Sequence, residues 1–174
     1  RRRSGAGRAR GAHPLMLSPA RVTVIDTVVS FDAPIEVTFD YLADPANRPE
    51  WQSSLRRIDD LRPIGDRAGD VGTSWTDVTV VPGVSPRMEV TACESRRRWQ
   101  EIGRWRSVDA VLTLTFAERD GGGRDAGTDV HAEAVLTVPA IGGLVLTATL
   151  WPAAQAVRAD LERAARLLAG RGSR

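Results

Sequence analysis

Two stretches of the chain, 108–118 and 127–138, alternate between apolar and polar positions. In the first, one side carries Ala110, Leu112, Leu114 and Phe116, opposite Val111, Thr113 and Thr115. In the second, one side carries Val130, Ala132, Ala134, Leu136 and Val138, opposite His131, Glu133 and Thr137. Because successive side chains of a strand point to opposite faces, the pattern predicts antiparallel strands with one face buried and the other in water.

Shorter segments rich in Val, Thr, Ile and Trp extend this sheet. They are separated by turn signals such as Gly65-Asp66, Pro82-Gly83 and the glycines at 121–123. The pattern predicts further strands over 21–31, 55–64, 70–81, 86–94 and 98–106. We therefore expect a sheet of seven strands, because these five join the two alternating segments.

Helical signals precede and follow the sheet strands. A first helix should begin near Ala33-Pro34 and end at Asp44-Pro45, with Val37, Tyr41 and Leu42 on one face. Residues 45–54 predict a short turn or helical fragment. A long C-terminal helix should follow the last strand, and Pro152 should either kink it or mark its start. Its apolar positions at helical spacing are Leu146, Leu150, Val157, Leu161, Ala164, Ala165 and Leu168.

The amino-acid composition excludes several classes of catalytic and metal site. All 24 basic residues are arginine, so no lysine is present for Schiff-base or phosphate-loop chemistry. One cysteine and two histidines are too few for a structural zinc site, and we expect neither metal nor cofactor. The single Cys93 also rules out an intrachain disulfide, which favours a cytoplasmic location.

The net charge of +2 is unevenly distributed. Residues 1–15 hold five arginines and no acid, which leaves 19 arginines against 22 acidic residues, or −3, for the rest of the chain. We expect a disordered basic arm over 1–20, one domain over 21–169 and a frayed tail over 170–174. No residue from Ala134 to Val157 is charged, but prolines and glycines interrupt this stretch. A strand leading into a pocket-lining helix therefore explains it better than a membrane span.

Tryptophans and carboxylates share faces on two of the predicted strands. Trp75 shares a face with Asp77, and Trp99 shares one with Glu101 and Trp105. If these faces point inward, indole rings and carboxylates line a cavity; if they point outward, they are ordinary surface.

A carboxylic acid in an apolar cavity has a raised pKa and can act as a general acid or base. Asp77 and Glu101 are the candidates, and Arg104 or Arg87 would polarise a carbonyl group beside them. The alternative is that these are solvated charges on strand surfaces.

Other conspicuous residues favour structural roles. His131 alternates with inward-facing apolar residues and should face water. Gly65, Gly69 and Gly72 precede a strand instead of a helix, so they predict a hairpin turn and not a phosphate loop. Basic and aromatic residues interleave over 96–106, a pattern found in nucleic-acid platforms: Arg96, Arg97, Arg98, Arg104 and Arg106 with Trp99 and Trp105. A solvated hairpin end explains the arginines better in a chain body of net negative charge.

Residues 33–51, APIEVTFDYLADPANRPEW, resemble the entry motif of the helix-grip (SRPBCC) superfamily, in its bacterial polyketide cyclase/dehydrase branch. Gly72-Thr73, Arg98-Trp99, 127–130 and 139–161 are similar to later parts of that pattern. The resemblance spans about residues 21–169. It implies an α+β helix-grip fold: a curved seven-stranded antiparallel sheet wrapped around a long C-terminal helix, with two short helices after the first strand. It also implies a cavity, which relatives use for sterols, lipids or polyketides without a shared catalytic set.

From the alternation, the tryptophans and this resemblance, we expect a protein that binds a hydrophobic small molecule between sheet and helix. One alternative is a polyketide cyclase or dehydratase that uses Asp77 or Glu101, with Arg104. A second is a membrane- or partner-associated adaptor, suggested by the arginine arm and the uncharged stretch. We expect no nucleic-acid partner and no transmembrane span, and the oligomeric state stays open. The expected ligand-binding residues are Trp75, Met88, Trp105, Leu112, Leu114, Phe116, Leu136, Leu146, Leu150 and Trp151.

Overall fold

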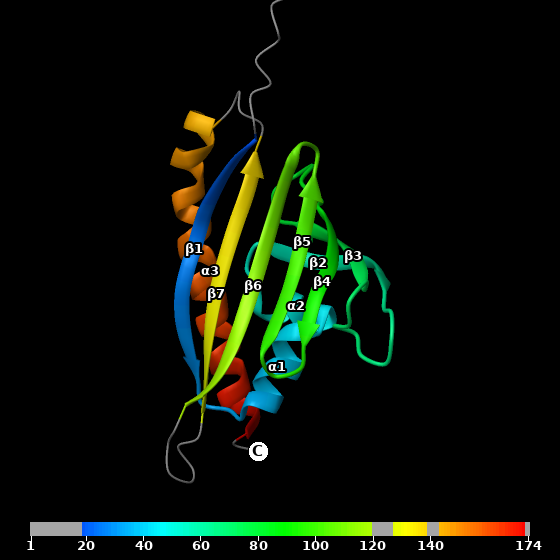
Figure 1. Cartoon of the computed structure of the whole chain (residues 1–174), viewed down its shortest axis with the longest axis vertical. Helices are drawn as coiled ribbons and strands as arrows, with labels where there is room; N and C mark the ends of the chain where they lie inside the picture. The colour runs from blue at the N-terminus through cyan, green and yellow to red at the C-terminus, as the bar shows by residue number, and fades with distance from the viewer. Residues whose placement is uncertain (1–18, 120–126, 139–142, 173–174) are drawn as a thin grey trace, which may run out of the picture.

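The computed structural model describes residues 19–119, 127–138 and 143–172, and for 143–155 it describes the backbone only. Seven strands form one antiparallel sheet in the order β1-β7-β6-β5-β4-β3-β2 (Figure 1). The strands are β1 (Ala20–Phe31), β2 (Leu55–Arg62), β3 (Ser74–Thr79), β4 (Arg87–Glu94), β5 (Arg98–Trp105), β6 (Val108–Arg119) and β7 (Gly127–Val138). The expected seven-stranded antiparallel sheet is confirmed, and most strand ends lie close to the predicted ones.

The strand predicted over 70–81 is shortened at both ends to β3, Ser74–Thr79. Before it, the backbone turns at Asp70–Gly72, where Thr73 N donates to Asp70 O at 3.0 Å and Gly72 has a φ of 92°. After it, Val84 N donates to Val81 O at 3.2 Å and closes the next turn. The β propensity of the valines is therefore overridden by turns that need the neighbouring glycines.

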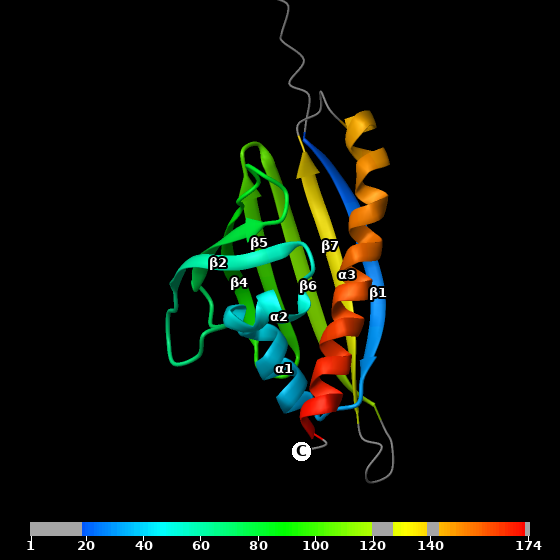
Figure 2. The ribbon, with the colours of Figure 1, turned by 180° about the vertical axis from the view of Figure 1, so that it is seen from behind.

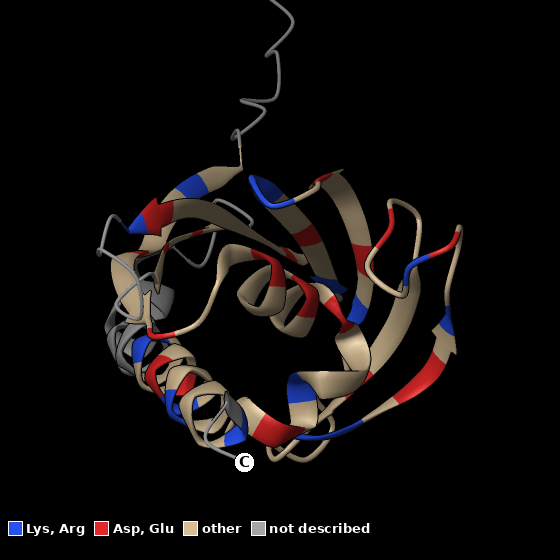
Figure 3. Ribbon diagram, turned by 90° about the horizontal axis from the view of Figure 1, so that it is seen from below, with Lys and Arg blue, Asp and Glu red and all other residues tan. Residues whose placement is uncertain are grey.

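Four helical segments lie on the concave side of the sheet: α1 (Ile35–Ala43), η1 (Pro45–Asn47), α2 (Arg48–Trp51) and α3 (Gly143–Gly172) (Figures 2 and 3). In α1, Tyr41 and Leu42 are buried as predicted, but Val37 is 48% exposed, so its placement on the same face was wrong. The buried face is instead Ile35, Phe39 and Leu42, which recur at the four- and three-residue spacing of one helix side.

The long C-terminal helix is confirmed, with Leu161, Ala164 and Leu168 buried. It begins at Gly143, so Pro152 lies inside it and does not mark its start. It also continues to Gly172, three residues into the segment 170–174 that was predicted to be a frayed tail. Arg171 explains this order: its guanidinium bonds Glu50 Oε2 at 2.6 Å and lies 5.0 Å from the ring centroid of Tyr41. Within the described residues, no helix is both long enough and apolar enough to cross a bilayer.

The burial of the inner sheet face changes along its length. At the end near α1, Leu114, Phe116, Val130 and Ala132 are buried. At the other end, which faces the beginning of α3 (Figure 2), Val138 is buried, but four other inward-facing side chains are only partly buried: Trp105, Ala110, Leu112 and Leu136. The concave surface therefore has two halves. The half under α1 is fully buried, and the other, which we call the apolar half, has side chains that keep partial solvent contact.

The loop before β3 passes very close to the end of α1. A Cβ atom added at Gly69 would clash with the carbonyl oxygen of Ala43, and Gly69 O accepts a hydrogen bond from Trp99 Nε1 at 3.1 Å. We expect Gly69→Ala to lower the free energy of unfolding by about 1–3 kcal/mol, because backbone atoms must move apart.

The matched control is Gly170→Ala on α3, where the added Cβ meets nothing within 4 Å. That substitution should raise stability by about 0.5–1 kcal/mol through helix propensity. Urea unfolding of both variants measures the pair, and a Gly69→Ala protein as stable as the unsubstituted chain would contradict the close approach.

Candidate functional site

The tryptophan and carboxylate faces of β3 and β5 point inward. Trp75 and Trp99 are fully buried, and Asp77 and Glu101 are only 4% and 3% exposed. Because these buried positions alternate with only partly buried residues along each strand, the inward alternative is the correct one. Two acidic side chains therefore lie inside the protein, where an uncompensated charge is costly.

Arg48 of α2 supplies the compensating charge. Its Nη1 donates to Glu101 Oε2 at 2.7 Å, and its Nη2 donates to Asp77 Oδ2 at 3.1 Å. The guanidinium carbon also lies 5.3 Å from the ring centroid of Trp75. All three charged side chains are at most 6% exposed, so α2, β3 and β5 are joined by one buried ionic cluster.

The turn between α1 and α2 places Arg48. Asp44 ends α1 and its Oδ1 accepts from Ala46 N at 2.9 Å, while Asn47 Nδ2 donates to Tyr41 O at 3.0 Å. Pro49 in the first turn of α2 suits a helix start. At the other end, Ser53 N donates to Asp160 Oδ1 of α3 at 2.9 Å. These bonds hold a helix of four residues in one orientation, with Arg48 toward the sheet.

The two carboxylates have different surroundings. Both oxygens of Asp77 are engaged, since Oδ1 accepts from Trp75 Nε1 at 2.8 Å and Oδ2 accepts from Arg48. Glu101 accepts through Oε2 alone, so within the described residues its Oε1 is open to a further partner. Asp77 thus has the contacts of a positioning residue, whereas Glu101 has an oxygen available for proton transfer.

The cluster holds one positive group and two acidic groups. Burial raises the pKa of Glu101; Arg48 opposes this, and the neighbouring Asp77 adds to it. Burial by itself would lower the pKa of Arg48, but Glu101 and Asp77 more than offset it and hold that pKa above its usual value. Arg48 therefore stays charged, and Glu101 is the group whose proton is retained to higher pH than usual.

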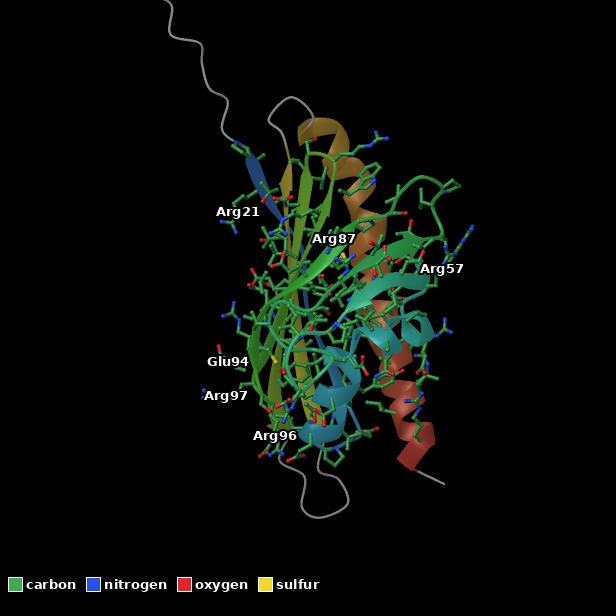
Figure 4. The ribbon with its side chains drawn as sticks, turned by 90° about the vertical axis from the view of Figure 1, so that its right-hand side faces the viewer. Arg21, Arg57, Arg87, Glu94, Arg96 and Arg97 are labelled. Carbon is green, nitrogen blue, oxygen red and sulfur yellow. The ribbon has the colours of Figure 1, made fainter. Side chains whose placement is uncertain are left out.

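The arginines expected to assist the carboxylates lie elsewhere. Arg104 is on the outer face of β5, where its Nη1 bonds Glu89 Oε2 at 3.0 Å. Arg87 is exposed at the start of β4 and bonds Ser74 Oγ at 3.2 Å (Figure 4). Both expectations were wrong because Arg104 alternates with Glu101 across the pleat, and Arg87 with the inward-facing Met88.

The expected ligand-binding residues fall into three groups. Leu114 and Phe116 are covered by protein, and the Phe116 ring lies 5.0 Å from that of Phe39 on α1. Trp105, Leu112 and Leu136 lie on the partly exposed apolar half, while Trp75 and Met88 are buried beside the ionic cluster. The side chains of Leu146, Leu150 and Trp151 lie outside the described residues.

The sequence patterns did not point to Arg48, which lies in the same turn as the buried Trp51, itself 3% exposed. The available signal was indirect: two inward carboxylates require a buried cation, and Arg48 lies in the only helical turn predicted between the first helix and the sheet. Arg48 lies 29 residues from Asp77 and 53 residues from Glu101 in the sequence, so no pattern within a single helix or strand links them.

Other residues singled out from the sequence have structural roles. His131 is on the outer face and bonds Asp26 Oδ1 at 2.8 Å. Gly65, Gly69 and Gly72 lie in the β2–β3 connection, as the hairpin interpretation predicted. Arg96 and Arg97 lie in the exposed β4–β5 turn (Figure 4), where Arg96 bonds Glu36 at 3.2 Å. The basic arm and part of the uncharged stretch, on which the adaptor alternative rests, lie outside the described residues.

Solved structures with this fold include a plant enzyme and bacterial proteins. Norcoclaurine synthase from Thalictrum flavum, in complex with dopamine and hydroxybenzaldehyde, is 15% identical and superimposes with a TM-score of 0.60 over 96% of this chain and 98% of that one. The protein TTHA0849 from Thermus thermophilus is 17% identical, with a TM-score of 0.62 over 84% of this chain and 97% of that one. At these identities, the likeness shows a shared helix-grip fold.

A search of curated proteins found no match. A family model described as polyketide cyclase / dehydrase and lipid transport matches residues 22–171. That match spans nearly the whole sheet, the α2 turn with Arg48 and nearly all of α3. This chain therefore belongs to the polyketide cyclase/dehydrase and lipid transport family.

Proposed function

We propose that this protein binds a hydrophobic small molecule against the partly exposed half of its concave sheet face. The observation that carries the proposal is the contrast along that face: Trp105, Ala110, Leu112 and Leu136 keep solvent contact although they point inward. Ligand sites are typically concave, largely apolar, and supplied with a few fixed polar groups. Here Glu101 is directly opposite Leu112 in the β5–β6 register, so the ionic cluster borders the apolar surface.

A specific observation also supports a catalytic function. Glu101 has a raised pKa, caused mainly by burial, and its Oε1, beside an apolar surface, accepts no hydrogen bond from any residue that the structure describes. Such a carboxyl group suits the dehydration of a β-hydroxyketone. Glu101 Oε1 would take a proton from the carbon next to the carbonyl and return it to the departing hydroxyl group. A carbon–carbon double bond forms, the carbon–oxygen bond breaks and water leaves.

The binding proposal is tested by filling the apolar half. Ala110→Trp places an indole on the inner face, whereas Val111→Trp places the same group on the outer face one residue away. We expect Ala110→Trp to weaken binding of the fluorescent probe phenylnaphthylamine by about tenfold or more. The new indole ring would occupy the space in which the probe contacts the apolar half of the sheet face.

Val111→Trp should bind the probe within about twofold of the unsubstituted protein, because the outer face is not part of the site. Thermal unfolding of both variants checks that the fold is kept. Absence of probe binding to the unsubstituted protein, or equal loss in both variants, would contradict the assignment of the site to the inner face.

A further inference from the structure

The turn that carries Arg48 leaves two buried N–H donors unpaired. Arg48 bonds the carboxylates through both terminal nitrogens, but its Nε has no acceptor, and neither has Trp51 Nε1, within the described part of the chain. Arg48 is 2% exposed and Trp51 is 3% exposed. An unpaired buried donor costs about 1–3 kcal/mol, so native proteins retain few of them.

The two donors belong to one side of one helix. Arg48 and Trp51 are three residues apart in α2, and residues at this spacing are neighbours on a helix surface. Arg48 extends from α2 to β3 and β5, so its Nε lies between the helix and the carboxylates. Gln52 Oε1, on the next residue along, is also buried and has no partner among the described residues, but it is an acceptor. The turn therefore concentrates unused hydrogen-bonding capacity beside the ionic cluster.

The charge of the cluster restricts what these donors can bind. With one cation and two acidic groups, the site is neutral when Glu101 is protonated and negative when it is not. A second anion would be repelled in a buried environment, where charges are poorly screened. A neutral carbonyl oxygen accepts two hydrogen bonds without adding charge.

We propose that Arg48 Nε and Trp51 Nε1 together bind a neutral carbonyl oxygen of the ligand. The inference rests on the proposed binding function and names its ligand class: a hydrophobic molecule with a ketone or aldehyde group, in preference to a hydrocarbon or a carboxylate. Arg48 then has two tasks, since its terminal nitrogens hold Asp77 and Glu101 while its Nε holds the ligand.

The test compares three ligands of one size and ring isomer by calorimetry: acetonaphthone, isopropenylnaphthalene and naphthoate. Isopropenylnaphthalene replaces the carbonyl oxygen of acetonaphthone with a methylene group, and naphthoate carries a charge. We expect acetonaphthone to bind about tenfold more tightly than either of the others at neutral pH, because only its carbonyl oxygen gives the two buried donors an acceptor without adding charge.

Trp51→Phe removes one donor and keeps the aromatic ring, so it should reduce the preference for acetonaphthone severalfold. Trp105→Phe is the matched control on the apolar half, and it should change the affinities of acetonaphthone and isopropenylnaphthalene equally. In the unsubstituted protein, the assigned indole N–H resonance of Trp51 should move downfield with acetonaphthone and stay in place with isopropenylnaphthalene. This measurement does not depend on the folding of a variant.

If the three ligands bind equally, or if the Trp51 indole resonance does not shift with acetonaphthone, the carbonyl assignment is wrong. The proposed binding function is not affected by that result. If none of the three binds while phenylnaphthylamine does, the ligand class is wrong. If no probe of either kind binds, the proposed function fails together with this inference.

Discussion

Replacing Arg48 with methionine should lower the free energy of unfolding by about 3–5 kcal/mol at neutral pH, because it leaves two buried carboxylates without a cation. Methionine keeps much of the volume of the arginine stem, so the loss is mainly electrostatic. Asp77 and Glu101 are each within 3.1 Å of the guanidinium, and no other arginine bonds them within the described residues. Denaturant unfolding monitored by tryptophan fluorescence measures the effect.

The control for this substitution is Arg104→Met. Arg104 also bonds a carboxylate at 3.0 Å, but its side chain is 50% exposed, and an exposed pair is worth about 0–1 kcal/mol. Adding Asp77→Asn and Glu101→Gln to Arg48→Met should restore much of the stability, because the uncompensated charges are gone. If Arg48→Met and Arg104→Met cost the same, or if the triple variant is no more stable than Arg48→Met, the ionic cluster does not have this role.

Replacing Glu101 with glutamine should slow dehydration of a naphthyl β-hydroxyketone by about 10²–10⁴-fold, the usual contribution of a positioned acid or base. Glutamine has nearly the same shape and its amide oxygen still accepts from Arg48, but it cannot carry a proton in transfer. The appearance of the conjugated enone, followed by its absorbance, gives the rate.

Asp77→Asn is the matched control, since both oxygens of Asp77 are already in hydrogen bonds. Its effect on the rate should be clearly smaller than that of Glu101→Gln. A Glu101→Gln protein with unchanged turnover would discard the catalytic role, and an unsubstituted protein that does not accelerate the reaction would reject the catalytic candidate while leaving ligand binding intact.

Glu101→Gln should also stabilise the fold at higher pH, relative to the unsubstituted protein. Burial raises the pKa of Glu101 in the folded protein, so the folded state holds this proton more tightly than the unfolded state. The stability that this provides is complete below the pKa of an unfolded glutamic acid and is lost as the pH rises through the folded pKa. The Glu101→Gln protein does not lose this stability, because glutamine has no proton to release.

We therefore expect the stability of Glu101→Gln relative to the unsubstituted protein to increase as the pH rises across that window. Unfolding curves at a series of pH values measure the difference. A difference that stays constant with pH would show that Glu101 does not titrate between the folded and unfolded states in this way.

Local sequence patterns were sufficient for the elements. Period-two alternation located β6 and β7 to within one residue, because their inner face must be apolar and their outer face polar. Proline and aspartate at 44–45 marked the end of α1 correctly, since their backbone and side-chain chemistry act over one turn. Val37 was misplaced because a nine-residue helix has two partly apolar sides, and only packing against β6 and β7 selects one of them.

The sequence by itself determined the fold class, the strands and the fact that Trp75 shares a face with Asp77 and Trp99 with Glu101, because these follow from the fixed geometry of one strand. Tertiary structure alone decided that those faces turn inward, that Arg48 meets both carboxylates, and that Arg104 does not. The direction of curvature of a sheet, and contacts across 29 and 53 residues, depend on how separate elements pack. No periodicity within an element encodes that packing.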